Sequence, residues 1–174
     1  MNFPDKVETD RLAISRFQAG DITDCYLKWL NDKEKMKFSN QRFYTHSRGS
    51  CLDYLASFDQ INKLFLAIKL KSNGTETELL GTSTVYFSPE HNTADVGLLI
   101  GLNGQGFGSE AWNAIISELL EQGIRKITAG CVEHNYAMRA IATKAGMQID
   151  CVKSDQEILD GVPTDIIYYA LFRT

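Results

Sequence analysis

Glycines occupy alternate positions in the segment NGQGFGSEA, residues 103–111, at Gly104, Gly106 and Gly108. They separate a strand-like segment from an apolar stripe with helical spacing. Glycine permits positive φ angles and close approach to a ligand, so consecutive N–H groups can turn toward one anion. The start of the following helix adds about half a positive charge. This segment therefore has the chemistry to bind a diphosphate through its backbone.

Two other phosphate-binding motifs do not fit this segment. A dinucleotide fingerprint GxGxxG that begins at Gly104 would place Ser109 at its third glycine, and no acidic residue ends a second strand about 20 residues later. A Walker A motif that begins at Gly101 would have Phe107 and Gly108 where Lys and Ser or Thr are required. A glycine-rich turn without a ligand remains the alternative.

The hydrophobic pattern predicts an α/β fold. Helices are expected at 21–31, 47–58, 109–122 and after Asn135. Strands are expected at 11–17, 63–70, 78–87, 94–101, 125–132, 147–152 and 165–172. Antiparallel hairpins come first, with Asn73 and Gly74 as a turn signal, and strand-helix-strand crossovers follow. We therefore expect a mixed, mostly antiparallel sheet of six or seven strands with helices on both faces.

Length and charge restrict the classes of protein. The 174 residues suffice for one domain, residues 1–174. Eighteen Lys and Arg against 22 Asp and Glu give a net charge of -4, which disfavours a nucleic-acid partner held through its phosphates. The start, MNFPDKVETDRLAISRF, lacks the apolar core of a secretory signal, and no window approaches about 18 apolar residues. We expect a cytoplasmic protein with no nucleic-acid partner and no membrane association.

The cysteines are too scattered for a metal site. They form no CxxC pair and have no companion histidines at the spacing of zinc ligands. We therefore expect no metal, and buried free thiols at Cys25, Cys51, Cys131 and Cys151. A catalytic cysteine would need a neighbouring base, and the candidate bases are the histidines His46, His91 and His134.

The glycine-rich segment closely resembles the acetyl-CoA loop of the GNAT N-acetyltransferase superfamily, written Q/R-x-x-G-x-G/A. Gly106 and Gly108 fall on its two fixed glycines, and Asn103 replaces the usual Gln or Arg. The segments ETDRLAISRF, YLKWLND, TADVGLLIG, CVEHNYAMRAIATKAGMQ and ILDGVPTDIIYYALF resemble landmarks of the Rim-type branch, whose members include enzymes that acetylate ribosomal-protein N-termini. The resemblance covers nearly the whole chain and implies a single GNAT domain.

This resemblance implies acetyl-CoA as the acetyl donor. Because coenzyme A and the protein are both negatively charged, long-range attraction would not deliver the cofactor, and local amides must hold it. We assign the diphosphate to the backbone of Gly104, Gln105, Gly106, Phe107, Gly108 and Ser109, with Asn103 beside them. In the family the preceding strand pairs with the pantetheine arm, which places this arm along Leu98, Leu99 and Ile100. Asn135 and Arg139 complete the implied cofactor site.

The family transfers acetyl by direct attack of an amine on the thioester, often with a strand carboxylate as base. Asp95 occupies the position where Rim-type enzymes carry a Glu, and a solvated strand aspartate is the alternative. Glu133 is the second candidate base, followed by His134. Asn135 is expected to cap the helix that begins at Tyr136, and the resemblance adds contact with the pantetheine or the acceptor.

Other family positions hold residues without a transferable proton. Met138 and Ala142 stand where relatives carry Ser or Tyr, which leaves the proton donor to the departing thiolate unassigned. A catalytically silent CoA-binding module is therefore one alternative function. A structural or interaction domain without the ligand is another.

An aromatic and polar mixture predicts the acceptor pocket, although packing in the core is the alternative for its aromatic residues. Its residues are Trp29, Phe38, Asn40, Gln41, Arg42 and Tyr44, with Tyr86 opposite. Their sequence resembles that of Rim-type members that act on small amines such as amino-sugar nucleotides, and Arg42 is a candidate to hold an anionic group. A protein N-terminus is the alternative acceptor, and the chain is expected to be a monomer or a homodimer.

Overall fold

The computed structural model describes residues 3–72, 75–102 and 104–173. Eight strands in these ranges form one sheet in the order β1-β2-β3-β4-β5-β6-β8-β7. Every neighbouring pair is antiparallel except β5 and β6, which are parallel. The strands are β1 (Lys6–Glu8), β2 (Leu12–Arg16), β3 (Lys63–Ser72), β4 (Thr75–Ser88), β5 (Thr93–Ile100), β6 (Lys126–Val132), β7 (Gln148–Leu159) and β8 (Val162–Phe172).

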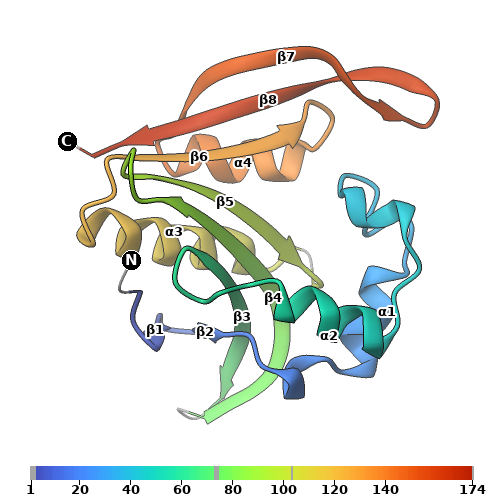
Figure 1. The fold of residues 1–174 in the computed structure, drawn as a ribbon, viewed down its shortest axis with the longest axis vertical. Coiled ribbons are helices and arrows are strands. Elements are labelled where there is room, and N and C mark those ends of the chain that lie inside the picture. The colour runs from blue at the N-terminus through green and yellow to red at the C-terminus, as the bar shows by residue number, and fades with distance from the viewer. Residues whose placement is uncertain (1–2, 73–74, 103, 174) are drawn as a thin grey trace.

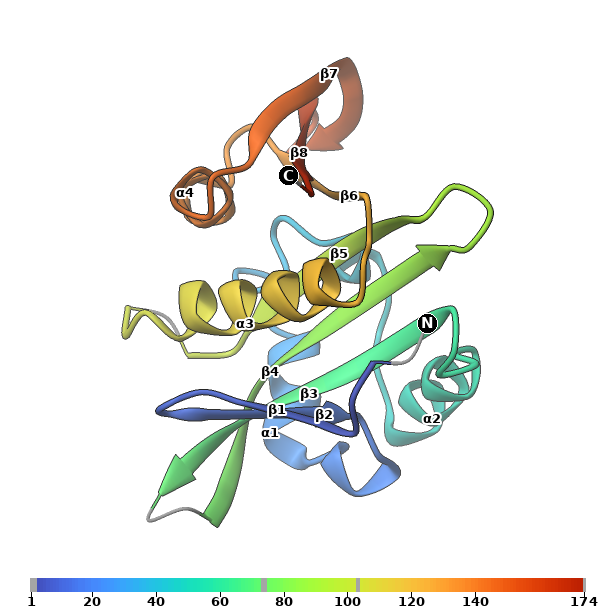
Figure 2. The same ribbon diagram turned by 90° about the vertical axis from the view of Figure 1, so that its left-hand side faces the viewer.

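The helices cover both faces of this sheet (Figure 2). One face packs against α1 (Asp24–Leu30) and α2 (Arg48–Ala56), and the other against α3 (Phe107–Glu121) and α4 (Tyr136–Lys144). Short 3₁₀ helices, η1 and η2, lie at Ala19–Asp21 and Asn40–Phe43. No helix in the described ranges is long and apolar enough to cross a membrane.

The predicted fold class is confirmed, but the sheet has eight strands rather than six or seven. The additional strand is β1, whose three residues are too few to show an alternating pattern. The last hairpin also differs, because β7 continues to Leu159, well beyond the predicted end at residue 152. All residues of β7 before Glu157 are exposed, so no apolar period marks its second half. The turn predicted at Asn73 and Gly74 lies outside the described residues.

The larger core lies between the sheet and α3. Ala111, Trp112, Ile115 and Leu119 are completely buried against apolar side chains of β2 to β6. Their i, i+3, i+4 spacing predicted this face. The helix begins at Phe107, two residues before the predicted Ser109, because Gly106 in the left-handed region acts as its N-cap.

A second, aromatic core lies under α1 and α2. The rings of Phe17 and Phe65 stack at 4.4 Å between centroids, and those of Phe58 and Phe65 at 5.0 Å. Tyr26 and Trp29 of α1 are buried in the same cluster. These contacts fix α1 and α2 on the sheet, and with them the segment that connects the two helices.

The sheet opens between β5 and β6. These strands pair over Thr93↔Lys126, Ala94↔Ile127 and Asp95↔Thr128, and they separate beyond that point (Figure 1). The backbone of β5 from Val96 to Ile100 therefore has no strand partner on its β6 side. The opening divides the sheet into two parts, β1 to β5 and β6 to β8, and the candidate site lies where they separate.

Candidate active site

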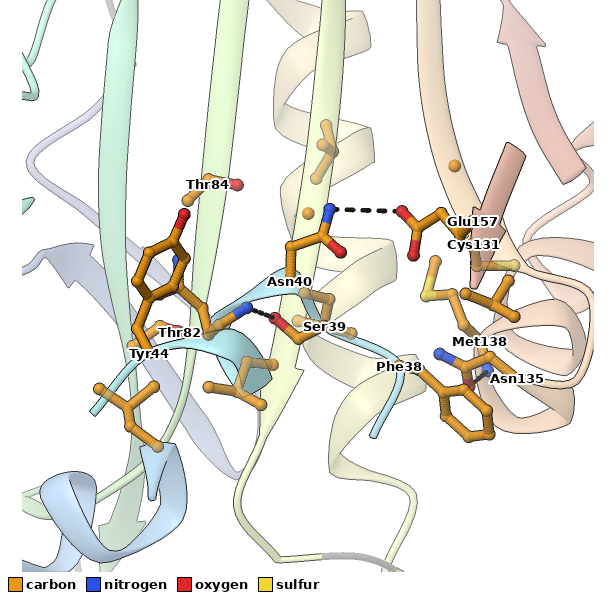
Figure 3. A pocket seen from close by; sticks show the side chains of 18 of the residues that line it. Phe38, Ser39, Asn40, Tyr44, Thr82, Thr84, Cys131, Asn135, Met138 and Glu157 are labelled. Carbon is orange, nitrogen blue, oxygen red and sulfur yellow. Dashed lines mark hydrogen bonds between the residues drawn. The ribbon is translucent and has the colours of Figure 1, made fainter. Parts of the chain in front are cut away.

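A cavity of about 670 Å³ occupies the opening between β5 and β6. Its walls come from both sides of the sheet and from the segment between α1 and α2. Figure 3 shows Thr82, Thr84 and Tyr44 on one side of it and Cys131 and Met138 on the other. Asp95 is part of the lining at the inner end of the opening, where the paired part of β5 stops.

The protein environment of Asp95 shifts the pKa of its carboxylate. Its Oδ2 accepts a hydrogen bond of 2.7 Å from the Thr128 hydroxyl, whereas Oδ1 has no hydrogen-bond partner among the described residues. Asp95 is exposed by its surface area, but the protein atoms crowded around its carboxylate remove part of its hydration and raise its pKa above the ordinary value, since this effect outweighs the lowering effect of the Thr128 hydrogen bond. A carboxylate whose pKa lies above the ordinary aspartate value is suited to accept a proton closer to neutral pH.

The glycine-rich loop forms the start of α3. Gly104 and Gly106 have φ angles of 88° and 78°, which side chains other than glycine rarely adopt. Gly106 supplies no side-chain cap, and the first helical hydrogen bond joins Glu110 N to Gly106 O. The N–H groups of Phe107, Gly108 and Ser109 at the first turn therefore have no helical acceptor. Asn103 lies outside the described residues.

Arg11 stabilises this loop, and the sequence did not predict this role. Its Nη1 donates to Gln105 O at 3.0 Å, and its Nε donates to Glu110 Oε2 at 2.6 Å. Its guanidinium also lies over the Phe107 ring, 4.6 Å from the centroid. These partners lie more than 90 residues away along the chain, so no local pattern could have indicated them.

These features fit coenzyme A. The unpaired N–H groups at the start of α3 can bind a diphosphate, since the helix dipole favours an anion there. The free edge of β5 can pair with a ligand that carries amides, in the way that an added strand pairs with a sheet. Leu98 and Leu99 line the cavity, whereas Ile100 packs on the core beneath α3. The loop lies outside the cavity lining, at the end of the same strand.

The site residues predicted around α4 have different environments in the structure, and only Asn135 lines the cavity. Asn135 lines the cavity, and its Oδ1 accepts from Met138 N at 3.1 Å, which confirms the predicted N-cap. Glu133 does not line the cavity and accepts a hydrogen bond from Asp165 N. Arg139 donates to Glu133 O at 2.9 Å and to the Tyr169 hydroxyl at 3.4 Å. The catalytic role of Glu133 and the phosphate contact of Arg139 stay predictions.

The predicted acceptor residues also divide into two groups. Phe38, Gln41 and Tyr44 line the cavity, and Asn40 lies with them. Trp29 is buried in the aromatic core, where its indole fills the space that a side chain at position 101 would need. Tyr86 is exposed, and neither Tyr86 nor Arg42 is part of the cavity lining.

Arg42 forms part of a bridge between the segment that connects α1 and α2 and the β7–β8 hairpin. Its Nη2 lies 3.3 Å from Oε2 of Glu157 on β7, and both side chains are largely buried. Asn40 Nδ2 donates to the other oxygen of Glu157 at 3.3 Å (Figure 3). Lys37 adds an exposed ion pair with Asp160. The segment of residues 37–46 is thus tied to the β7–β8 hairpin, and Arg42 has an intramolecular anion as its partner.

Sulfur-containing side chains form the wall on the α4 side. Cys131 and Met138 line the cavity. Burial raises the pKa of the Cys131 thiol to about 11, so this thiol is protonated near neutral pH. All four cysteines are free, but only Cys51 and Cys131 are buried, which corrects the expectation of four buried thiols. The prediction failed for Cys25 and Cys151 because Cys25 lies on the outer side of α1 and Cys151 on the exposed strand β7.

Comparison with protein families identifies the class. A family model described as an acetyltransferase (GNAT) domain matches residues 11–148. The chain therefore belongs to the GNAT acetyltransferase family, and it is an acetyl-CoA-dependent N-acetyltransferase. No curated protein sequence matches it significantly.

Solved structures share the fold over nearly the whole chain. RimL, a ribosomal-protein α-N-acetyltransferase in complex with coenzyme A, has a TM-score of 0.84 and 17% identity over 96% of this chain and 97% of its own. Spermidine N-acetyltransferase from Vibrio cholerae, with CoA and spermine, has a TM-score of 0.83 and 13% identity over 95% and 97%. The microcin C7 self-immunity acetyltransferase MccE, with acetyl-CoA and AMP, has a TM-score of 0.81 and 20% identity over 94% and 93%. At these identities the likeness establishes the fold.

Proposed function

We propose that this enzyme acetylates a small-molecule primary amine, such as an amino-sugar nucleotide, with Asp95 as the general base. The observation that carries the proposal is the position of Asp95. It ends the paired part of β5, lies in the cavity and has a raised pKa. A base at this point can take the proton of an amine that enters from the cavity.

The cofactor site is assigned to the backbone of residues 104–109, the free edge of β5 at 98–100, and the side chain of Asn135. When bound, acetyl-CoA supplies an activated acetyl thioester. The protein holds it through amides rather than cationic side chains, in keeping with a net charge of -4. Arg11 contributes by fixing the loop through Gln105 O and by neutralising Glu110 in the first turn of α3.

Asp95 is held ready for proton transfer. The Thr128 hydroxyl fixes Oδ2, and Oδ1 remains available for the amine or for a bridging water. The amine attacks the thioester carbonyl directly, so no acyl-enzyme is required. Asn135 lies on the other side of the opening, and its amide group can donate to the donor or to the acceptor while its oxygen caps α4.

The bridged segment supports a small acceptor. Residues of the 37–46 segment line the cavity, and Asn40 and Arg42 tie this segment to β7, which favours a compact substrate over an extended peptide. A protein N-terminus is the alternative acceptor, in keeping with the fold shared with RimL, a protein α-N-acetyltransferase. Met138 and Ala142 have no proton to give the departing thiolate, so this proton comes from water, from another hydroxyl such as that of Tyr136, or from the product ammonium.

Some properties of the whole protein are also proposals. The four free cysteines support a reducing compartment, and we place the enzyme in the cytoplasm. We propose that residues 1–174 act as a single GNAT domain, as a monomer or a homodimer.

The test combines turnover with cofactor binding. Release of free thiol from acetyl-CoA is followed with a panel of amino sugars, their nucleotides, polyamines and short peptides, and we expect turnover with a small amine. Coenzyme A at about 100 times its dissociation constant should stabilise the protein by about 2.7 kcal/mol, or roughly 5 to 11 °C in melting temperature. Stabilisation without turnover across the panel would favour the silent module, and turnover restricted to peptides would favour the protein N-terminus.

A further inference from the structure

Two threonines on β4 form the floor of the cavity on the α1 and α2 side. Thr82 and Thr84 both line the cavity, and Figure 3 shows them on the same side as Tyr44. Thr84 is paired with Phe65 on β3 and Gly97 on β5, while Thr82 is paired with Ala67 and Leu99. Cross-strand partners share a face, so both hydroxyl-bearing side chains lie among apolar or small neighbours.

The hydroxyls of Thr82 and Thr84 are free to bind a molecule in the cavity. Its residue is 5% exposed, and neither Thr82 nor Thr84 forms a side-chain hydrogen bond among the described residues. By contrast, Ser83 between them donates to Gly97 O at 2.7 Å. Thr82 lines the cavity and its hydroxyl is not sealed from solvent there, so a molecule in the cavity can reach it. A polar ligand in the cavity would supply the missing partner.

Their spacing relates the two hydroxyls to Asp95. Residues two apart on a strand lie about 7 Å from each other on one face. Tyr86, the next residue on this face, is paired with Asp95, so Thr84 lies one such step from the base and Thr82 two steps. A six-membered ring that contacts both threonines would extend along β4 and direct a substituent toward Asp95.

The charges of the cavity indicate which ring this is. Apart from Asp95, the fully charged side chains of the lining are Lys153 and Glu157 on β7. Glu157 is paired with Arg42, and the Lys153 ammonium lies over the Tyr168 ring, 4.8 Å from the centroid. The segment opposite β4 adds the uncharged polar side chains of Ser39, Asn40 and Gln41. Such a lining matches an uncharged, hydroxylated ring better than a polyamine.

We propose that Thr82 and Thr84 form the acceptor subsite, which binds the hydroxyls of an amino-sugar ring and presents its amine to Asp95. This inference rests on the proposed acetyltransferase function and names the part of the acceptor that is recognised. Because threonine hydroxyls both donate and accept, they can bind sugar hydroxyls in either sense.

The test compares glucosamine with cyclohexylamine, a ring amine without hydroxyls. Wild-type kcat/KM should favour glucosamine by about 100-fold or more, because a site built for hydroxyls rejects an analogue that lacks them. Thr82→Val and Thr84→Val should each lower kcat/KM for glucosamine by about tenfold, mainly through KM, and change cyclohexylamine by less than about twofold. Thr82→Ser should restore the preference, and Thr77→Val, an exposed position on the same strand, serves as the matched control.

Equal losses for both amines, or a wild-type preference for cyclohexylamine, would overturn the subsite. If no amine is acetylated, the proposed function fails, and calorimetric binding of glucosamine to the CoA-loaded protein decides the subsite separately. Binding that Thr82→Val weakens and Thr82→Ser preserves would support it. Binding that is absent, or indifferent to both variants, would overturn it.

Discussion

The Thr128 hydroxyl donates a hydrogen bond of 2.7 Å to Oδ2 of Asp95, across the last residue pair that joins β5 to β6. The proposed base is therefore anchored where the sheet begins to open. The hydrogen bond lowers the pKa of Asp95, although burial has the larger, opposite effect. Thr128 thus acts as a positioning residue, with consequences for both rate and pH dependence.

Thr128→Val should raise the pKa of Asp95 further, because it removes a donor to the charged form. Asp95 acts as a base only when ionised, so activity falls as pH drops through its pKa, and the acidic limb of the kcat/KM profile should move to higher pH. Thr128→Ser keeps the donor and should retain the wild-type profile. If the acidic limb of the Thr128→Val profile stays at the wild-type pH, Asp95 does not titrate in the reaction.

Asp95→Asn should slow acetyl transfer by about 10² to 10⁴, the usual contribution of a general base, while binding of coenzyme A is preserved. Steady-state rates and calorimetric titration with coenzyme A measure the two effects separately. Since the amide does not ionise in this range, the acidic limb of the pH profile should also disappear. Wild-type activity in this variant would remove Asp95 as the base.

Gly106→Asp should abolish cofactor binding by placing a carboxylate beside the diphosphate site. Two charges about 4 Å apart at an effective dielectric near 20 repel by about 4 kcal/mol, so affinity should fall by more than about 100-fold. Gly106→Asn imposes the same strain at a φ of 78° without the charge and is the matched control. Equal thermal stabilisation of both variants by coenzyme A would contradict the assigned loop.

Glu110→Gln should destabilise the folded protein by about 1 kcal/mol at neutral pH, because Arg11 and Thr9 lose a charged acceptor while Arg11 stays half exposed. Although burial alone would raise it, these hydrogen bonds lower the pKa of Glu110 in the folded state. Its stabilisation is therefore complete above the unfolded pKa of about 4.3 and is lost as pH falls through the folded pKa.

Urea unfolding at several pH values measures this effect. The stability difference between wild type and Glu110→Gln should be constant near neutral pH and vanish in acid. Glu121→Gln, an exposed position on the same helix, should differ from wild type by less than about 0.5 kcal/mol. A difference that persists in acid would show that the carboxylate charge is not its source.

Arg42→Ala should raise KM for the acceptor by about fivefold and leave the affinity for coenzyme A unchanged. The segment 37–46 loses its tie to Glu157, and a partly buried carboxylate loses its cation. Lys37→Ala removes the exposed pair with Asp160 and should have almost no effect. If Arg42 contacts the acceptor directly, adding Glu157→Gln would leave the defect of Arg42→Ala unrelieved, whereas a bridge predicts partial relief.

Local patterns predicted most of the fold. The apolar spacing in α3 and the alternating strands are signals carried by neighbouring residues, and the structure confirms them. The sequence did not predict β1, because its three residues form a strand only when paired with β2. The full length of β7 was not predicted, because the second half of this strand is stabilised by pairing with β8 rather than by its own composition.

The site was less predictable for the same reason. The sequence selected Asp95, but its partner Thr128 comes from a strand whose register no pattern specifies. Arg11 and Glu157 were missed, because each makes its contacts with distant segments. Thr82 was missed, because only the pairing of β4 with its neighbours places it in the cavity. Trp29 was assigned to the acceptor pocket, yet its place in an apolar helical stripe fits the core position that it occupies.

The short pairing between β5 and β6 determines how the two parts of the sheet are joined. The two parts of the sheet share backbone hydrogen bonds over a few residues only, and the edge of β5 beyond Asp95 is not paired with β6. A bound pantetheine arm would serve as an inserted strand and join the two halves. If the cofactor binds along β5 as proposed, the acetyl donor would complete the sheet each time it is bound and leave it open when coenzyme A departs.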